Sequence, residues 1–186
     1  STSWGSSSGQ FANYPSTVNH GTNFLGAESP ATQLAATNRC PAIRQTGSFG
    51  DPGAAFVVQL QNTLGLANFL LTVDLNLLSV QSRTNSWVID YSTGNSPGIF
   101  FPVLTNADAG AFGTTTRTVS FGSALDNQPQ NVWIRIAALD LATGSGTRDT
   151  FGIDNFKLTF EPQNPISPIP LKIQLIGTNA VLSWTN

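Results

Sequence analysis

The fold of this chain is decided by residues 68–80, which read Asn-Phe-Leu-Leu-Thr-Val-Asp-Leu-Asn-Leu-Leu-Ser-Val. Large apolar side chains recur there at every second position, at Phe69, Leu71, Val73, Leu75 and Leu77. A β-strand turns successive side chains to opposite faces, so this set faces one side and packs against another sheet. At ~3.3 Å per residue the strand would run about 40 Å, and we therefore expect a bend or a bulge in it.

Shorter alternating segments surround this strand. They cover residues 55–60, 86–92, 99–104, 114–121, 131–139 and 151–160, and turn-forming residues such as Gly94–Gly98 separate them. Residues 1–50 are rich in Ser, Thr, Asn and Gly and predict loops with short edge strands. Many short strands with turns between them predict an all-β fold, an antiparallel β-sandwich of jelly-roll type over residues 1–160.

The C-terminal part has a different composition. Residues 161–170 contain four prolines, which predict a stiff, extended Pro-rich linker. Residues 171–176 and 179–184 then alternate between apolar and polar side chains around Gly177-Thr178. This pattern predicts a C-terminal β-hairpin tail over residues 171–186.

Composition narrows the function. Only 10% of the 186 residues are charged, against about 25% in ordinary soluble domains, and the net charge is −2. Lys and Arg form no cluster, so a nucleic-acid partner is not expected, and no apolar run is long enough to predict a membrane span. A polar, nearly uncharged surface is typical of secreted modules, and the start at Ser1 suits a processed terminus. We expect an extracellular or cell-surface location.

Three stretches carry a family resemblance: residues 87–92, 131–136 and 152–156, the last beginning Gly-Ile-Asp-Asn. Together they resemble the jelly-roll modules of large secreted bacterial proteins, which are similar to carbohydrate-binding and MAM-like domains. The resemblance covers about residues 30–160. The tail resembles the opening strands of a small β-module that often follows such domains.

Residues for catalysis are scarce. His20 is the single histidine, Cys40 is the single cysteine, and Glu28 and Glu161 are the two glutamates. A hydrolytic triad, a His/Cys metal site and a glycosidase carboxylate pair all need more than this. We therefore expect no enzymatic activity, and we expect Cys40 to be buried as a small apolar side chain.

Asp154 is the candidate metal-binding residue. The alternation in residues 151–160 predicts Phe156, Leu158 and Phe160 inward, with Asp154 in the same register. In the resembling modules an acidic residue near this place helps to hold a structural Ca²⁺, so calcium is the one candidate cofactor. The alternative is that Asp154 accepts hydrogen bonds from backbone amides, or from Arg135 or Arg148.

Trp133 is the candidate glycan platform. It alternates with Val132 and Ile134, so it points away from the core if they point inward. It is then either an exposed aromatic platform on the sheet or a side chain buried under a loop. Tyr14, Trp4 and Trp87 are further candidates.

The tail is the candidate self-assembly element. Leu171, Ile173, Leu175, Leu182 and Trp184 form one apolar face in the predicted hairpin. A lone two-stranded hairpin is marginally stable, so the tail must pack on a sheet of its own chain or of a neighbouring copy. The stiff linker favours a neighbour, and head-to-tail strand donation builds filaments.

Two functions follow from these features. The first is a non-catalytic extracellular structural or adhesive subunit that self-assembles through its β-tail, with other copies of itself as partners. The alternative is a carbohydrate-binding accessory module of a secreted polysaccharide-degrading system, with glycans as partners.

Overall fold

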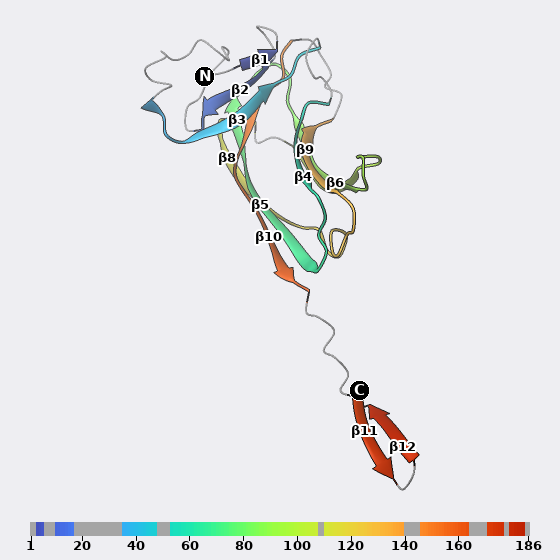
Figure 1. The fold of residues 1–186 in the computed structure, drawn as a ribbon. Helices are drawn as coiled ribbons and strands as arrows, with labels where there is room; N and C mark the ends of the chain where they lie inside the picture. The colour runs from blue at the N-terminus through green and yellow to red at the C-terminus, as the bar shows by residue number, and fades with distance from the viewer. Residues whose placement is uncertain are drawn as a thin grey trace.

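The computed structural model describes residues 3–5, 10–16, 35–47, 53–107, 110–139, 146–163, 171–176 and 179–184. This part of the chain contains twelve strands, and every pair of neighbouring strands is antiparallel. Ten of the strands form two sheets that face each other (Figure 1). The all-β sandwich expected from the alternating segments is confirmed.

The larger sheet has six strands in the order β1-β2-β3-β10-β5-β8. Their bounds are β1 Ser3–Gly5, β2 Gln10–Pro15, β3 Arg39–Arg44, β10 Thr150–Pro162, β5 Leu66–Ser79 and β8 Gly113–Ser120. The smaller sheet has four strands in the order β4-β9-β6-β7. Their bounds are β4 Ala55–Leu60, β9 Val132–Ala138, β6 Ser86–Thr93 and β7 Phe101–Ala107.

The strand order is that of a jelly roll. From β3 to β10 the pairs are nested, with β3 beside β10, β4 beside β9, β5 beside β8 and β6 beside β7. One long hairpin of eight strands has thus folded over into two four-stranded layers, which defines a jelly roll. Strands β1 and β2 extend one layer beyond β3.

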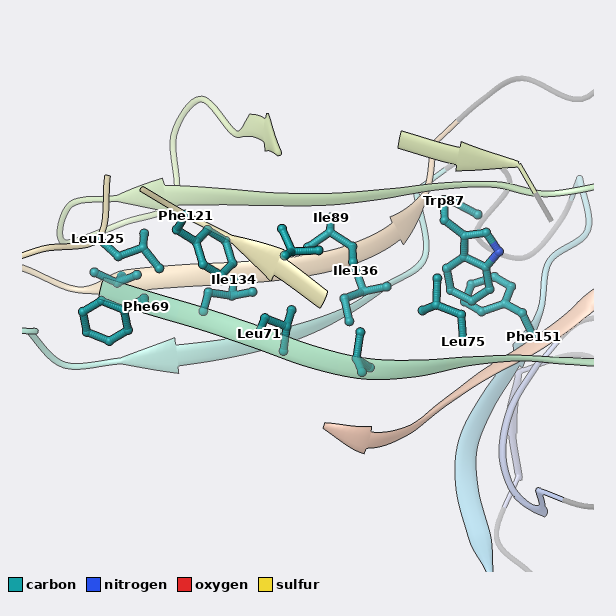
Figure 2. Packing of buried hydrophobic residues seen from close by; sticks show 14 of the residues in the cluster. Phe69, Leu71, Leu75, Trp87, Ile89, Phe121, Leu125, Ile134, Ile136 and Phe151 are labelled. Carbon is teal, nitrogen blue, oxygen red and sulfur yellow. The ribbon is translucent and has the colours of Figure 1, made fainter. Parts of the chain in front are cut away.

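The core lies between the sheets. The alternate residues of β5 from Phe69 to Leu77 are all buried, as the sequence pattern predicts. Figure 2 shows Phe69, Leu71 and Leu75 pointing toward side chains of the opposite sheet, including Ile89, Ile134 and Ile136. Trp87 packs on Phe151 with ring centroids 3.6 Å apart.

One N-terminal strand was not expected where it lies. β3 runs inside the larger sheet between β2 and β10, and Cys40 and Ile43 in it are fully buried. The sequence predicts loops with short edge strands in residues 1–50 from their polar composition, and Pro41 within this segment would also favour a sheet edge. The structure accommodates Pro41 because the β10 ladder pairs only with Ala42 and Ile43, so Pro41 lies beyond it.

Because of a bulge in β10, the Asp154 side chain faces the opposite way from the predicted one. Asp154 is opposite Asp74 on β5, and the next paired residue is Lys157, opposite Thr72. Asn155 takes a left-handed φ of 48° at this bulge, which shifts the alternation by one residue. Phe156 still contacts the core, but Asp154 lies on the outer face beside Asp74, and its predicted inward register is wrong.

A buried polar cluster closes one end of the sandwich. Arg44, 3% exposed, donates hydrogen bonds from Nε to Thr150 Oγ1 (2.5 Å) and from Nη2 to Ser79 Oγ (2.8 Å). Burial lowers the pKa of Arg44 to about 10, and the charges of Tyr14 and Asp149 partly oppose this shift. Hydrogen bonding of this kind is what allows polar groups to lie in an interior.

The C-terminal strands are β11, Leu171–Ile176, and β12, Asn179–Trp184. They form a two-stranded sheet of their own, with Leu171 opposite Trp184 and Ile173 opposite Leu182. Both strands of the predicted hairpin are therefore found at the predicted residues, while residues 177–178 and 185–186 lie outside what the structure describes. In the part of the chain that is described, no helix is both long and apolar enough to cross a membrane.

Candidate functional site

The outer face of the four-stranded sheet carries the candidate site. Val132, Ile134 and Ile136 of β9 are buried in the core, so the residues between them, Trp133 and Arg135, point outward. In the register with the neighbouring strand β6, Arg135 is opposite Asp90 and Trp133 is opposite Ser92. These residues occupy the two central strands of the sheet.

Arg135 and Asp90 form a bidentate ion pair. Nε of Arg135 lies 2.9 Å from Oδ1 of Asp90, and Nη2 lies 2.6 Å from Oδ2. The Asp90 side chain is 3% exposed, whereas the Arg135 side chain is 21% exposed. The two parallel hydrogen bonds fix the guanidinium plane, and the two charges cancel at the surface.

Phe100 covers the ion pair from outside. The guanidinium carbon of Arg135 lies 3.8 Å from the centroid of the Phe100 ring, a cation–π contact. Phe100 is half-buried, and its neighbour Ile99 is 75% exposed. On the other side of Arg135, Val57 of β4 is opposite it in register and is 49% exposed.

Trp133 is half-buried beside this pair. Its indole Nε1–H donates a hydrogen bond to the carbonyl oxygen of Gly94 at 3.2 Å. Gln59 of β4, which is exposed, is opposite Trp133 in register. The sequence leaves two alternatives for Trp133, an exposed platform or a side chain buried under a loop. The structure combines them, because a loop holds the N–H edge of the ring while the side chain stays partly accessible.

The loop that holds Trp133 is fixed by backbone bonds. Gly94 directly follows β6 and has a φ of 125°, a conformation that favours glycine, and its N–H donates to the carbonyl of Asn131 at 2.9 Å. The Gly98 N–H donates to Ser92 Oγ at 3.3 Å, and Asn131 Nδ2 donates to the Asn95 carbonyl at 3.3 Å. The loop is thus tied to the strand ends on both sides, which holds both aromatic rings in place.

This arrangement can do two things chemically. Two partly exposed aromatic rings offer flat apolar surfaces, with Val57 and Ile99 extending them. Beside Trp133, Gln59 of β4 and the remaining N–H groups of Arg135 offer hydrogen-bond donors, and the amide oxygen of Gln59 offers an acceptor. Flat apolar surface next to planar polar groups binds a molecule with an apolar face and polar edges.

Asp154, the predicted metal residue, lies on the outer face of the other sheet. Its Oδ2 accepts a hydrogen bond from Ser16 Oγ at 2.7 Å, and its Oδ1 accepts one from the Asn155 backbone N–H at 2.8 Å. The carboxylate opposite it, Asp74, accepts from Asn155 Nδ2 at 2.7 Å and from Thr116 Oγ1 at 2.5 Å. Neutral donors therefore surround both carboxylates, as the backbone-amide alternative predicts.

The described residues offer Asp154 no further metal ligands of the usual kinds in a group of three or more. Among the described residues no group of three or more His, Cys, Asp or Glu side chains is placed to hold a metal ion. Calcium binding at Asp154 stays a prediction. The two arginines expected as alternative partners lie elsewhere, since Arg135 binds Asp90 and Arg148 donates to the Thr84 carbonyl.

The remaining candidates divide into three groups. Trp87 is core, at 3% exposure, and Tyr14 is buried with Cys40 in a second small apolar cluster. Glu161 is exposed and accepts a hydrogen bond from Asn68 Nδ2 at 2.7 Å. His20, Glu28 and the side chains of Trp4, Leu171, Ile173, Leu175, Leu182 and Trp184 lie outside what the structure describes.

Sequence reasoning did not place four residues at this site, namely Arg135, Asp90, Gln59 and Phe100. Asp90 could have been found, because it alternates with core residues Ile89 and Tyr91 and therefore points outward like Arg135. Opposite charges on the outer face of neighbouring strands predict a cross-strand pair. Phe100 carries no such signal, since its position depends on how the preceding turn folds.

Comparison with known proteins does not extend the argument. No protein-family model and no curated protein matches the chain. Solved structures similar to it include a Xylanase10C mutant from Cellvibrio japonicus in complex with xylopentaose, at TM-score 0.46 and 13% identity. That match covers 64% of this chain, and the chain spans only 22% of the xylanase.

Two further solved structures are similar to the chain at comparably low sequence identity. A Stig cyclase, Fisc from Fischerella sp. TAU, has TM-score 0.45 and 15% identity over 83% of this chain and 75% of the cyclase. A protein described as "CBM4 structure and function" has TM-score 0.35 and 12% identity over 66% of this chain and 84% of its own. Likeness this distant decides nothing about activity. The class that the fold itself defines is an antiparallel jelly-roll β-sandwich.

Proposed function

We propose that this chain is a non-catalytic, extracellular carbohydrate-binding module, and that it holds a neutral polysaccharide on the outer face of its four-stranded sheet. The observation that carries the proposal is the placement of Trp133 and Phe100 around the Arg135–Asp90 ion pair on that face.

The chemistry of a sugar ring matches this face. A pyranose has a face of C–H groups, which packs on an aromatic ring, and a rim of hydroxyl groups, which pair with planar amide and guanidinium groups. Trp133 supplies the aromatic surface, while Gln59 and Arg135 supply hydrogen bonds beside it. Both kinds of group lie on one sheet face within neighbouring strands.

Charge selects the class of glycan. Asp90 neutralises Arg135 through two hydrogen bonds, so the pair attracts neither an acidic nor a basic chain strongly. The proposal is therefore a neutral polysaccharide rather than a polyuronate or a sulfated chain.

The rigidity of the site supports the binding of a sugar. The Gly94 carbonyl fixes the Trp133 ring, and Asp90 fixes the Arg135 plane. Side chains that are ordered before the ligand arrives lose little entropy on binding, which strengthens affinity for a weakly interacting ligand such as a sugar.

The test is affinity electrophoresis through gels that contain soluble xylan, mixed-linkage β-glucan, galactomannan or polygalacturonate. The wild-type chain should be retarded by at least one neutral polysaccharide. Trp133→Ala should weaken that binding about tenfold or more, because Trp is the residue whose loss most often costs an interface its affinity. Phe112→Ala is the matched control, an aromatic 39% exposed next to the other sheet, and it should bind as the wild type does.

The proposal fails if no neutral polysaccharide retards the wild type, or if Trp133→Ala and Phe112→Ala bind alike. Release of reducing ends during the same incubations would contradict the non-catalytic part alone. The structural or adhesive function expected from the tail has less direct support, because it depends on β11 and β12 and not on the sandwich face.

A further inference from the structure

Four strands end the two sheets of the sandwich. β1 and β8 end the six-stranded sheet, and β4 and β7 end the four-stranded sheet. An edge strand presents backbone N–H and C=O groups to other chains, and proteins protect such edges with short strands, proline, bulges or inward-pointing charges. The edge that lacks every protection is therefore the one suited to accept a further strand.

Three of the four edges are protected. β1 has only three residues. β7 contains Pro102, and its register with β6 is irregular between Ile89 and Asp90. β8 carries Arg117 on the same side as the core residue Val119, so a charged side chain points toward the interior at this edge.

β4 has none of these features. It reads Ala-Phe-Val-Val-Gln-Leu over Ala55–Leu60, without charge or proline, and its register with β9 is regular over its whole length. Val57 is 49% exposed in the middle of it. An uncharged strand without proline, in which Phe56, Val57 and Val58 have high β-propensity, is a composition that readily pairs with another strand.

The core side of β4 is also incompletely covered. Phe56, Val58 and Leu60 are each half-buried, whereas the residues opposite the first and last of them on β9, Ile136 and Val132, are at most 1% exposed. An additional strand beside β4 would cover the side chains that the edge leaves open. Burial of apolar surface would then add to the backbone hydrogen bonds.

The hairpin supplies a strand of matching length and composition. β12, Asn179–Trp184, has six residues and no charge, as β4 has, while β11 contains Lys172. Among the described strands, β11 and β12 pair only with each other, and a two-stranded hairpin alone is marginally stable in water. Pairing with a further strand would therefore stabilise the hairpin.

The position of the linker favours a host on another copy. β10 ends with Pro162 opposite Leu66, and the Gln163 N–H donates to the Gly65 carbonyl at 2.7 Å, so the chain leaves the sandwich beside the start of β5. The predicted linker begins at residue 161, but β10 includes residues 161 and 162; the sequence that follows the strand, residues 163–170 with three prolines, favours an extended spacer. An extended spacer carries the hairpin away from the β4 of its own chain.

We infer that β12 of one copy adds to β4 in a second copy, at the edge where none of the described strands pairs with β4. The contact joins two different surfaces, so it repeats head to tail and makes chains of modules. This inference goes beyond glycan binding and does not rest on it. Where both hold, the assembly sets several glycan-binding faces in a row and raises the avidity for a polysaccharide.

The test uses three variants of the full chain in sedimentation equilibrium over a wide range of concentration. Val57→Lys places a charge on the acceptor edge, and Leu182→Pro removes a backbone donor from the donor strand. Thr118→Lys is the matched control, an equal charge at an exposed position of β8. The average mass of wild type and Thr118→Lys should rise with concentration, while the other two should keep the mass of one chain.

Mixing the two inactive variants gives the decisive result. Val57→Lys retains its donor strand and Leu182→Pro retains its acceptor edge, so the mixture should form a one-to-one dimer and nothing larger. Near-ultraviolet circular dichroism checks that each variant is folded, and Gln59→Lys replaces Val57→Lys if the latter unfolds.

The inference is overturned if the wild type keeps the mass of one chain at every concentration. It is also overturned if a folded acceptor-edge variant assembles as the wild type does. Assembly that persists in Leu182→Pro would also overturn it, and would indicate that a second β4, instead of β12, pairs with the β4 edge.

Discussion

The outer face of each sheet carries carboxylates, Asp90 on the four-stranded sheet and Asp74 with Asp154 on the six-stranded sheet, and the partners of these carboxylates differ. On the four-stranded sheet, Asp90 is paired with Arg135 and covered by Phe100. On the six-stranded sheet, Asp154 and Asp74 accept hydrogen bonds from Ser16, Thr116 and Asn155, which are all neutral. The first face combines fixed polar groups with aromatic surface, whereas the second saturates its carboxylates with local donors.

The Gly-Ile-Asp-Asn segment, residues 152–155, lies on the second of these faces, and its residues have structural roles there. A Cβ at Gly152 would lie 2.6 Å from Cys40 Sγ and 3.0 Å from the Pro41 carbonyl oxygen, so the strands approach closely there. Asp154 accepts the Asn155 N–H, and Asn155 adopts the left-handed φ of the bulge. Each of these residues shapes the sheet. The segment marks the fold, and the candidate binding residues lie on the other sheet.

The largest expected effect is on the face with the ion pair. Asp90→Ala leaves Arg135 without its carboxylate while Phe100 still covers the guanidinium, and removal of one member of a mostly buried pair costs about 3 kcal/mol of unfolding free energy. Urea denaturation measures this value. The double variant Asp90→Ala/Arg135→Ala should recover part of the loss, because no unpaired charge remains. A loss that is equal or larger in the double variant would show that the pair is not the cause.

A smaller effect is expected where β10 meets β3. Gly152→Ala forces a methyl group against Cys40 and the Pro41 carbonyl, and overpacking of this kind costs about 2 kcal/mol. The control is Gly122→Ala, since nothing lies within 4 Å of a Cβ there although its φ of 56° is unfavourable for alanine. Thermal unfolding should rank Gly152→Ala as the less stable of the two. The reverse order would contradict the close approach of the strands.

Asp154→Ala sharpens the comparison between the two faces. It removes two hydrogen bonds with neutral donors and should cost about 1 kcal/mol, clearly less than Asp90→Ala. If these donors are the partners of Asp154 in solution and calcium is not, a chelator should leave the melting temperature of the wild type unchanged. A melting temperature that falls with chelator in the wild type, and no longer falls in Asp154→Ala, would instead establish calcium at this face.

The smallest effect concerns Cys40, which is fully buried as expected from the sequence. Burial raises the pKa of its thiol above 9.0, although hydrogen bonds with Ser16 and Asn76 oppose the shift. Above pH 9 the unfolded chain therefore loses this proton before the folded chain does, and the unfolding free energy falls as the pH rises. Urea denaturation at pH 7 and at about pH 10 should show a drop up to about 1 kcal/mol larger in wild type than in Cys40→Ala. An equal drop in both would contradict burial of the thiol.

The sequence predicts the positions of the strands better than it predicts which side chains lie on their outer faces or where each strand lies in its sheet. Apolar side chains recur at every second position from Phe69 to Leu77, and β5 is found there. The alternating segments of β4, β11 and β12 likewise form strands where their patterns predict them. Alternation fails at Asp154, since the bulge at Asn155 depends on pairing with β5, a strand distant in sequence. It also fails to predict β3, whose central place depends on β10 and β2 and not on its own composition.

The candidate site shows the same limit. Trp133 is found from its own strand, because alternation alone determines which face it lies on. The Arg135–Asp90 pair needs the register of two strands, and Phe100 needs the path of the loop that begins at Gly94. Residues whose role depends on one strand are predictable, and those that depend on two elements meeting are found only in the structure.

The central claim is that the outer face around Trp133 binds the glycan, and the indole N–H signals of the chain in an NMR titration test it most directly. Trp133 donates its indole N–H to Gly94, whereas Trp87 lies in the core. Addition of the neutral polysaccharide that retards the protein most should shift the Trp133 signal in a saturable way and leave the Trp87 signal in place. A saturable shift of other indole signals, with that of Trp133 unchanged, would contradict the claim.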